Sequence, residues 1–81
     1  MSLDSVIQEV RAERVRQVDD LGFDPEHDER VGVHGLAWLV AMRSVALTSQ
    51  SVVISDPTAT REKLLEAAAI AIAAIQYIDR N

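Results

Sequence analysis

The chain has 81 residues, and its 48% hydrophobic and 26% charged content is typical of a globular domain rather than a disordered segment. The absence of cysteine excludes disulfides and thiolate metal sites, and the net charge of −5 argues against binding a nucleic-acid duplex, whose phosphates require a basic surface. Residues 1–81 are expected to form a single helical domain, and because so short a chain buries a limited core, a homodimer is favoured.

The first predicted helix extends from Leu3 to Leu21. Apolar residues recur in it at spacings of three and four, which places them on one face of a helix. Ser2 is suited to cap its N-terminus, and Gly22 is suited to end it in a left-handed conformation. No basic stretch followed by an apolar run precedes this helix, so the sequence predicts a cytoplasmic location.

The segment from Gly22 to Arg30 is predicted to be a loop, because it combines Pro25 with a dense run of acidic residues. Its acids and His27 are of the types that bind metals, but their spacing matches no EF-hand loop. We therefore interpret the segment as a solvated acidic loop, with Phe23 packed against the bundle.

The second predicted helix extends from Val33 to Thr48 and is apolar on more than one face. A helix of that kind is buried on several sides, so we expect it to be the central helix or to lie at a subunit interface. Trp38 is expected to fill core space with its indole N–H at an edge. The surrounding stretch lacks acidic residues, but Arg43 in its middle and the polar residues after it argue against a membrane span.

Asp56 and Pro57 predict the start of a third helix, as N-cap and first helical residue, after an extended connector at residues 50–55. This helix is expected to end near Asp79. Its main apolar stripe consists of Leu64, Ala68, Ala71, Ile75 and Ile78. Together the segments predict an all-α fold, a three-helix antiparallel bundle that dimerises into a larger helical bundle. The residues expected at or near the dimer interface are Leu36, Val40, Ala68, Ile72 and Ile75.

Three blocks of the sequence resemble small phage and mobile-element proteins of the MazG-like family. The blocks are Glu13-Arg14-x-Arg16-Gln17 with Leu21-Gly22-Phe23 and Pro25-Glu26-His27-Asp28, the segment 32–39, and the stretch from Arg61 to Arg80. Members of this family are all-α nucleoside triphosphate pyrophosphohydrolases, which cleave a triphosphate to the monophosphate and pyrophosphate with magnesium. The resemblance therefore implies a dimeric helical bundle and, in an active protein, Mg²⁺ as cofactor.

The resemblance breaks at the family's magnesium motif, which places Glu-Glu-x-x-Glu on the central helix and Glu-x-x-Asp on a later one. Here the central stretch carries Arg43 and no acid, while the later helix retains Glu62 and Glu66 around Lys63. Because residues three or four apart share a helix face, these two glutamates are the candidate metal ligands. A positive charge beside them repels a cation, so the motif is degraded.

Two interpretations remain open. In the first, the protein is an active pyrophosphohydrolase whose metal site has moved and recruits Glu9, Glu13 or the acids of the 24–29 segment. In the second, the fold persists without catalysis, and the protein binds a nucleotide or acts as an interaction or inhibitor module for another protein. The candidate nucleotide-binding residues are Arg14, Gln17, His27, Trp38 and Arg43. A further prediction is that Arg43 forms a salt bridge with Glu62 or Glu66 in place of the magnesium ion.

Overall fold

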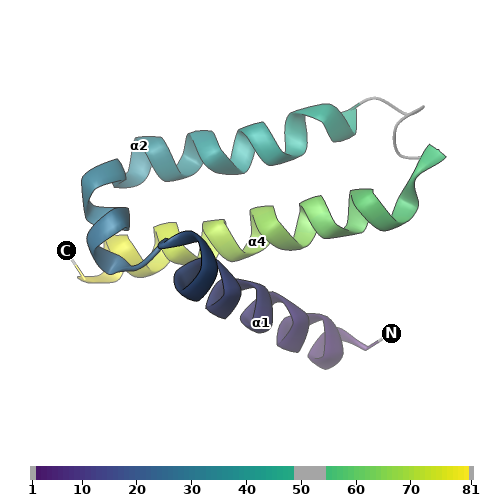
Figure 1. Cartoon of the computed structure of the whole chain (residues 1–81), viewed down its shortest axis with the longest axis horizontal. Coiled ribbons are helices and arrows are strands. Elements are labelled where there is room, and N and C mark those ends of the chain that lie inside the picture. The colour runs from purple at the N-terminus through teal and green to yellow at the C-terminus, as the bar shows by residue number, and fades with distance from the viewer. Residues whose placement is uncertain (1, 49–54, 81) are drawn as a thin grey trace.

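Residues 2–48 and 55–80 are described by the computed structural model of the chain, and they contain helices and no strand (Figure 1). The elements in chain order are α1 (Leu3–Leu21), α2 (Pro25–Ser44), the short 3₁₀ helix η1 (Val45–Thr48) and α4 (Pro57–Arg80). The all-α, three-helix prediction is confirmed for these residues. The extended connector predicted at residues 50–55 lies outside the described residues except for its last position. Within the described part of the chain, no helix combines the length and the apolar content that crossing a bilayer requires.

α1 has the bounds and both caps that the sequence predicts. The Ser2 hydroxyl accepts a hydrogen bond from the Ser5 backbone N–H at 3.2 Å, which satisfies one of the free donors of the first turn. At the other end Gly22 adopts a left-handed conformation with a φ of 72°, and its backbone N–H donates to the Gln17 carbonyl. A glycine is favoured there because a Cβ atom is disfavoured at positive φ.

α2 begins at Pro25, so the loop predicted over residues 22–30 is confirmed only for residues 22–24 and is wrong from Pro25 onward. Asp24 caps the helix by accepting a hydrogen bond from the His27 backbone N–H at 2.9 Å, and Pro25 occupies the first helical turn. The Asp-Pro pair is the same signature that correctly predicts the start of α4. Two of the acids that suggested a loop, Glu26 and Asp28, lie in the first turn of α2, where negative charge stabilises the helix N-terminus.

α2 changes direction at Gly32, whose φ of 72° and ψ of 174° lie outside the helical region. That combination is accessible to glycine and strained for other residues. The bend turns the first part of α2 across the end of the bundle, near the C-terminus of α1, and directs the second part along α4 (Figure 1). η1 then continues α2 to Thr48, the residue at which the second helix was predicted to end.

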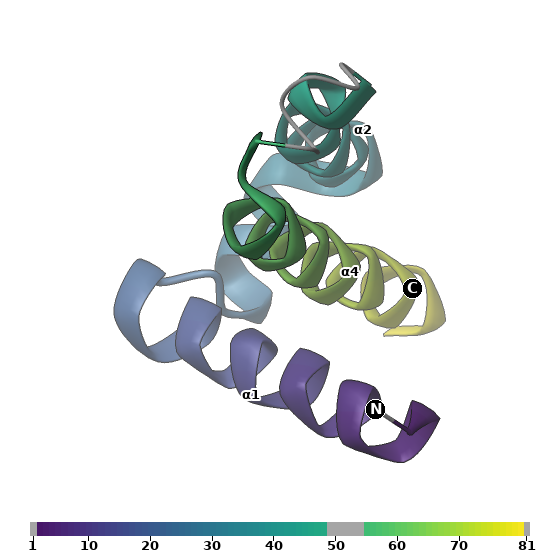
Figure 2. The same ribbon diagram turned by 90° about the vertical axis from the view of Figure 1, so that its right-hand side faces the viewer.

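α4 lies between α1 and α2 and packs against both (Figure 2). Its N-terminus is capped as predicted, because the Asp56 carboxylate accepts a hydrogen bond from the Ala59 backbone N–H at 3.0 Å. The buried apolar core of the described residues consists of Ala67, Ala69, Ile70 and Ala73 from α4, with Leu36 from α2. Alanine side chains let neighbouring helices approach α4 closely. Of the two alternatives predicted for the second helix, the central position is therefore wrong, and a place at a subunit interface stays a prediction.

α2 buries one side rather than several. Trp38, expected in the core, is 60% exposed, whereas Leu36, expected near a dimer interface, is 1% exposed and packs inside the subunit. These two positions lie on nearly opposite sides of the helix, because two residues correspond to a rotation of about 200°. The side that carries Leu36 faces α4, so neither prediction for these two side chains holds.

The main apolar stripe of α4 does not build the core of the subunit. Leu64, Ile75 and Ile78 are 53%, 58% and 55% exposed, whereas Ile70 on another side of the helix is 0% exposed. The residues of the stripe share one side of α4 as predicted. Ala68 and Ala71 lie half-buried in a groove beside α1, whereas the larger side chains of the stripe stay exposed.

Candidate functional site

A cavity of about 450 Å³ lies between α1 and the N-terminal half of α4, and five of its seven lining residues are charged. The lining residues are Glu13 and Arg16 from α1 and Ala59, Glu62, Lys63, Leu65 and Glu66 from α4. Glu62 and Glu66 both reach the cavity because residues four apart lie on adjacent turns of one side of a helix. The two predicted metal ligands therefore line one cavity, and α1 adds a third carboxylate to it.

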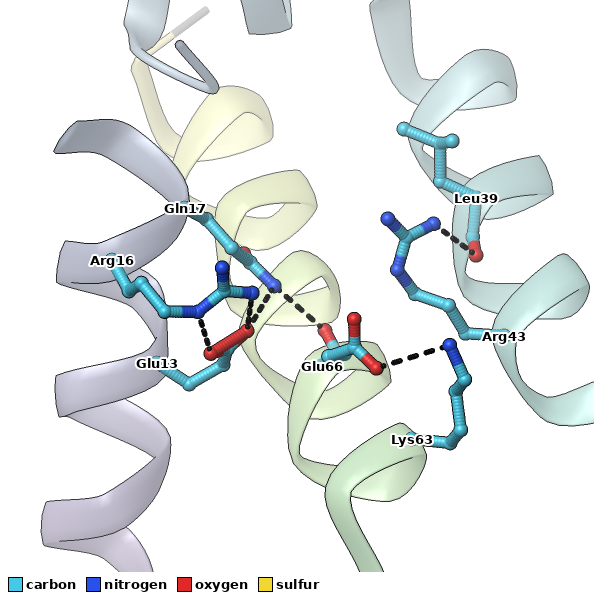
Figure 3. Close-up of polar contacts among 7 residues, drawn as sticks. All are labelled: Glu13, Arg16, Gln17, Leu39, Arg43, Lys63 and Glu66. Carbon is cyan, nitrogen blue, oxygen red and sulfur yellow. Dashed lines mark hydrogen bonds and ion pairs between the residues drawn. The ribbon is translucent and has the colours of Figure 1, made fainter. Parts of the chain in front are cut away.

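Glu13 is held by a bidentate ion pair with Arg16. The guanidinium Nε lies 2.6 Å from Oε1 of Glu13, and Nη2 lies 2.8 Å from Oε2 (Figure 3). These hydrogen bonds lower the pKa of Glu13 below its ordinary value of 4.5, against the opposing effect of burial, and the charge of Arg16, the Gln17 amide and the charge of Arg43 lower it further. The same hydrogen bonds raise the pKa of Arg16, so both groups are charged at neutral pH.

Gln17 joins α1 to α4 next to this ion pair. Its side chain is fully buried, and Nε2 donates to the Glu66 backbone carbonyl at 3.1 Å and to Oε2 of Glu13 at 3.3 Å (Figure 3). Its Oε1 has no hydrogen-bond partner. The side-chain amide thus connects the two helices through its Nε2 donor. Its buried carbonyl oxygen stays unpaired, which is unfavourable for stability.

Arg43 does not form the predicted salt bridge with Glu62 or Glu66. Its Nη1 donates to the Leu39 backbone carbonyl at 3.5 Å, one turn earlier in α2, and its buried Nε has no hydrogen-bond partner (Figure 3). The Glu66 carboxylate is paired with Lys63 at 3.5 Å instead. Lys63 is three residues away on the same helix, so it reaches this carboxylate without crossing between helices. Arg43 still places a positive charge between α2 and α4 (Figure 3).

The cavity residues do not fit a magnesium site of the family type. Mg²⁺ requires several oxygen ligands in near-octahedral geometry. In the described residues, no three acidic, histidine or cysteine side chains are grouped so that they could hold an ion. The carboxylates of Glu13 and Glu66 are paired with cationic side chains, and Glu62 is exposed. Of the two donors that the resemblance assigns to magnesium, Glu66 is thus paired with a lysine and Glu62 is exposed.

A second polar cluster lies at the corner between α1 and α2 and centres on Asp28, whose side chain is fully buried. Arg14 of α1 donates from Nη2 to Oδ2 of Asp28 at 2.9 Å and from Nη1 to the Phe23 carbonyl at 2.8 Å. Nδ1 of His27 lies 3.2 Å from Oδ1 of Asp28, and the His27 ring stacks on Phe23 with the ring centroids 4.5 Å apart. The cluster ties the end of α1 to the start of α2 through charge-assisted hydrogen bonds.

The corner also argues against a relocated metal site at residues 24–29. The Asp24 carboxylate caps α2, and the Asp28 carboxylate is enclosed by its ion pair with Arg14. These two acids are therefore committed to the fold. Phe23 is partly buried against the His27 ring, which agrees with its predicted packing on the bundle.

The five candidate nucleotide-binding residues lie in three separate places. Arg14 and His27 meet at the corner, Gln17 and Arg43 lie near the α1–α4 cavity, and Trp38 is exposed on the outer side of α2. The structure does not gather them into one pocket. Because Arg14 holds a buried carboxylate, its replacement would disturb folding before it reported on nucleotide binding.

Arg16 and Lys63 determine the charge balance of the cavity, although neither was predicted as a site residue. A local signal existed for both, because each lies three residues from the glutamate with which it pairs. Arg61 and Glu9 form another ion pair between α4 and α1, with nitrogen–oxygen distances of 2.9 and 2.5 Å. No local spacing predicts this pair, since its members are far apart in the chain.

Comparison with protein-family models, with curated proteins and with solved structures gives no match for this chain. The likeness to MazG-like proteins therefore rests on the three sequence blocks alone. The chemistry of the cavity has to be interpreted from its own residues, which are three carboxylates, two of them already neutralised by neighbouring cations.

Proposed function

We propose that the chain is a MazG-like helical protein that retains the bundle of the nucleotide pyrophosphohydrolases but acts by binding and not by catalysis. The observation that carries this proposal is the pairing of the cavity carboxylates, in which Glu13 binds Arg16 and Glu66 binds Lys63. Side chains thus provide the positive charge that the resemblance assigns to magnesium.

A magnesium ion entering the cavity would have to displace these cations. The pair between Arg16 and Glu13 is bidentate, which is the geometry in which a guanidinium binds a carboxylate most strongly. Arg43 adds a third positive charge, which contributes, after the hydrogen bonds from Arg16, to the lowered pKa of Glu13. Like charges repel at these distances, so the cavity disfavours a further cation.

The direct test of the proposal is release of pyrophosphate from a panel of ribonucleoside and deoxyribonucleoside triphosphates, with Mg²⁺ or Mn²⁺. We expect no release above that of the nucleotide alone. Glu66→Gln is the control, because it removes an acid that the family reaction would require. Metal-dependent release by the native chain that disappears in Glu66→Gln would overturn the proposal.

Binding without turnover is tested by thermal unfolding in the presence of each nucleotide, with and without magnesium. A ligand that binds only the native state raises the apparent stability by about 2.7 kcal/mol at a hundredfold excess over its dissociation constant. Arg43→Gln and Lys63→Gln should reduce this shift, because each removes positive charge beside the cavity. Arg11→Gln, at an exposed position of α1, should leave the shift unchanged.

A second candidate function is a helical interaction module that contacts another protein chain. The observation that favours it is the exposure of large apolar side chains on all three helices, including Ile7 on α1, Trp38 on α2 and Ile75 on α4. Exposed apolar surface that is continuous marks a contact site. A homodimer is the simplest such contact, and it is compatible with both candidate functions. The panel of nucleotides separates the two, because a pure interaction module gives no thermal shift with any of them.

A further inference from the structure

A long groove runs between α1 and α4, apart from the charged cavity. Its central part has a volume of about 600 Å³, and a hollow at each end shares lining residues with it, so the three form one groove. α4 contributes lining residues from Arg61 to Arg80, which corresponds to about 28 Å of helix. The long groove is therefore elongated, unlike a compact pocket for a small molecule.

The long groove and the charged cavity lie on different sides of α1. Arg11 lines the groove and Glu13 lines the cavity, and two residues correspond to a rotation of about 200°. Gln17 is fully buried and donates to α4 from the side of α1 that lies between them. A ligand in the cavity and a partner in the long groove therefore do not compete for the same side chains.

The surface of the long groove is mainly apolar. Ile7 and Val15 of α1 and Leu64 of α4 line it, and each of these large side chains is half or more exposed. The small residues Ala68 and Ala71 lie between the two helices and leave room in the groove. A partner that fills the groove would remove this apolar surface from water, which is favourable.

The charge balance of the long groove is opposite to that of the whole chain, which has 13 acidic and 8 basic residues. The charged residues that line it are Arg11, Arg14, Arg61, Arg80 and a single acid, Asp19. Two of the arginines are held in ion pairs with Asp28 and Glu9. Arg11 and Arg80 are exposed, and neither has an ion-pair partner in the part of the chain that the structure describes. The rim of the groove is thus suited to acidic groups.

The shape and the charge of the long groove together select its occupant. A helix of about 18 residues has the length of the groove, and binding of the apolar face of an amphipathic helix in an apolar groove is a recurrent mode of protein recognition. A second copy of this chain is disfavoured there, because a two-fold contact uses the same surface on both copies and would bring the arginine rims together.

We propose that the long groove binds an amphipathic helix of another protein, in which acidic side chains flank the apolar face. The apolar face would cover Val15 and Leu64, and the flanking acids would pair with Arg11 and Arg80. The proposal rests on the second candidate function, the helical interaction module, and names the surface used and the chemistry of its partner.

A synthetic helix tests the proposal directly. The probe is a fluorescein-labelled peptide of about 18 residues, with leucine at every third or fourth position, glutamate beside the leucines and alanine elsewhere. The matched control peptide carries lysine in place of every glutamate. Fluorescence anisotropy with the native chain should give a Kd for the acidic peptide that is lower by about tenfold or more. Equal affinity for both peptides, or no binding of the acidic peptide, overturns the proposal.

Val15→Asp tests the apolar surface of the groove. Val15 is 53% exposed, so the variant should keep its helical circular dichroism, but a charge against the apolar face should weaken binding of the acidic peptide by about tenfold or more. Met42→Asp is the matched control, at a position of α2 that is 50% exposed and outside the groove, and it should leave the Kd unchanged. Equal effects of the two substitutions overturn the assignment of the surface.

Arg80→Glu tests the rim, because it replaces an attraction for the acidic peptide by a repulsion. It should weaken binding of this peptide by about fivefold or more and strengthen binding of the lysine peptide. Arg30→Glu, at an exposed position of α2 outside the groove, is the matched control. Binding of the acidic peptide that is unaffected by Arg80→Glu overturns the role of the rim.

Other occupants of the groove give different results. A native chain that is dimeric by light scattering and monomeric as Val15→Asp would show that a second copy fills the groove, which overturns the proposal. Sedimentation with phosphatidylglycerol vesicles that is lost in Arg80→Glu, without binding of the acidic peptide, would assign the groove to a membrane surface and also overturn it.

The outcomes for the groove and for the proposed function are separable. Arg11→Gln should weaken binding of the acidic peptide but leave the thermal shift with nucleotides unchanged, because this arginine lines the groove and not the cavity. Pyrophosphate release by a native chain that binds the acidic peptide would overturn the non-catalytic function and support the groove. A native chain that shows a thermal shift with a nucleotide and does not bind the acidic peptide would overturn the groove alone.

Discussion

The two polar clusters of this protein use the same side-chain types in different surroundings. At the corner between α1 and α2, the Asp28 side chain is 0% exposed and its partner Arg14 is 13% exposed. In the α1–α4 cavity, Arg16 is 43% exposed beside Glu13, and Lys63 is 54% exposed. An arginine pairs with a carboxylate at hydrogen-bond distance in both clusters, through one nitrogen at the corner and through two in the cavity, and the exposure of the arginine separates the clusters further.

Solvent access determines what each cluster can do. A buried carboxylate or guanidinium that loses its partner is left without water and costs about 3–5 kcal/mol, whereas an exposed ion pair contributes about 0–1 kcal/mol. The corner therefore stabilises the fold. An ion pair of the cavity can open at a small free-energy cost, so that a charged ligand can replace one of its partners, as a binding site requires.

The largest expected effect is at the corner. Asp28→Ala should lower the free energy of unfolding by about 3–5 kcal/mol, because it leaves the enclosed Arg14 guanidinium without its carboxylate. Urea unfolding followed by circular dichroism measures the change. Glu26→Ala in the same turn is the control, since this side chain is 84% exposed and its loss should change the stability by less than about 0.5 kcal/mol. Equal effects of the two substitutions would contradict the contrast between the clusters.

The geometry of the corner also depends on the bend in α2. Gly32→Ala should lower the free energy of unfolding by about 1–3 kcal/mol, because its φ and ψ are strained for any residue with a Cβ atom. No atom lies within 4 Å of the position that this Cβ would occupy, so the cost is conformational and not steric. Gly22→Ala should cost less, about 1 kcal/mol, because its left-handed conformation is more accessible. The reverse order in urea unfolding would contradict this account of the bend.

At the edge of the cavity, Gln17→Leu should lower the free energy of unfolding by about 1 kcal/mol. The change removes the donor to the Glu66 carbonyl, but it also removes the unpartnered Oε1, so the two effects offset in part. Gln8→Leu at an exposed position of the same helix provides the matched control. A loss at Gln17 as large as the one at Asp28 would show that the cavity is as rigid as the corner.

The smallest effect is expected for Glu13 and appears as a dependence on pH. Its folded-state pKa lies below the ordinary 4.5, so its contribution to stability is fully present above pH 4.5 and is lost as the pH falls through the lowered pKa. The contribution is about 0–1 kcal/mol, because Arg16 is partly exposed. Urea unfolding from neutral pH to below 4.5 should show a stability difference between native chain and Glu13→Gln that shrinks with acidity. A stability difference between the two proteins that stays constant over this pH range would contradict the lowered pKa of Glu13.

Capping and spacing along the chain were sufficient to locate α1 and α4. Ser2, Gly22 and Asp56 all act on backbone groups a few residues away, so their effect can be read without the tertiary structure. The Asp24 cap is equally local. The loop prediction fails there because it relies on the density of acidic residues and not on Asp24-Pro25 as the start of a helix. The bend at Gly32 has no comparable local signal, since a glycine tolerates several conformations and does not specify one.

Without any coordinates, the residue order already predicts that Glu62 and Glu66 share one side of a helix and that the central stretch carries Arg43 and no acid. Helical periodicity is sufficient for both conclusions. The packing of the helices is needed to show that Glu13 joins these two acids and that Lys63, rather than Arg43, pairs with Glu66. The reason is that such contacts depend on the distance between helices, which no local pattern contains.

The same division applies to the apolar residues of α4. Periodicity determined that the stripe from Leu64 to Ile78 lies on one side of the helix. It could not determine whether that side faces the core, because α4 also carries Ala67, Ala69 and Ala73 on other sides. The packing of α1 and α2 against α4 buries those alanines instead, which makes α4 the central helix and leaves the large side chains of its most regular apolar stripe exposed.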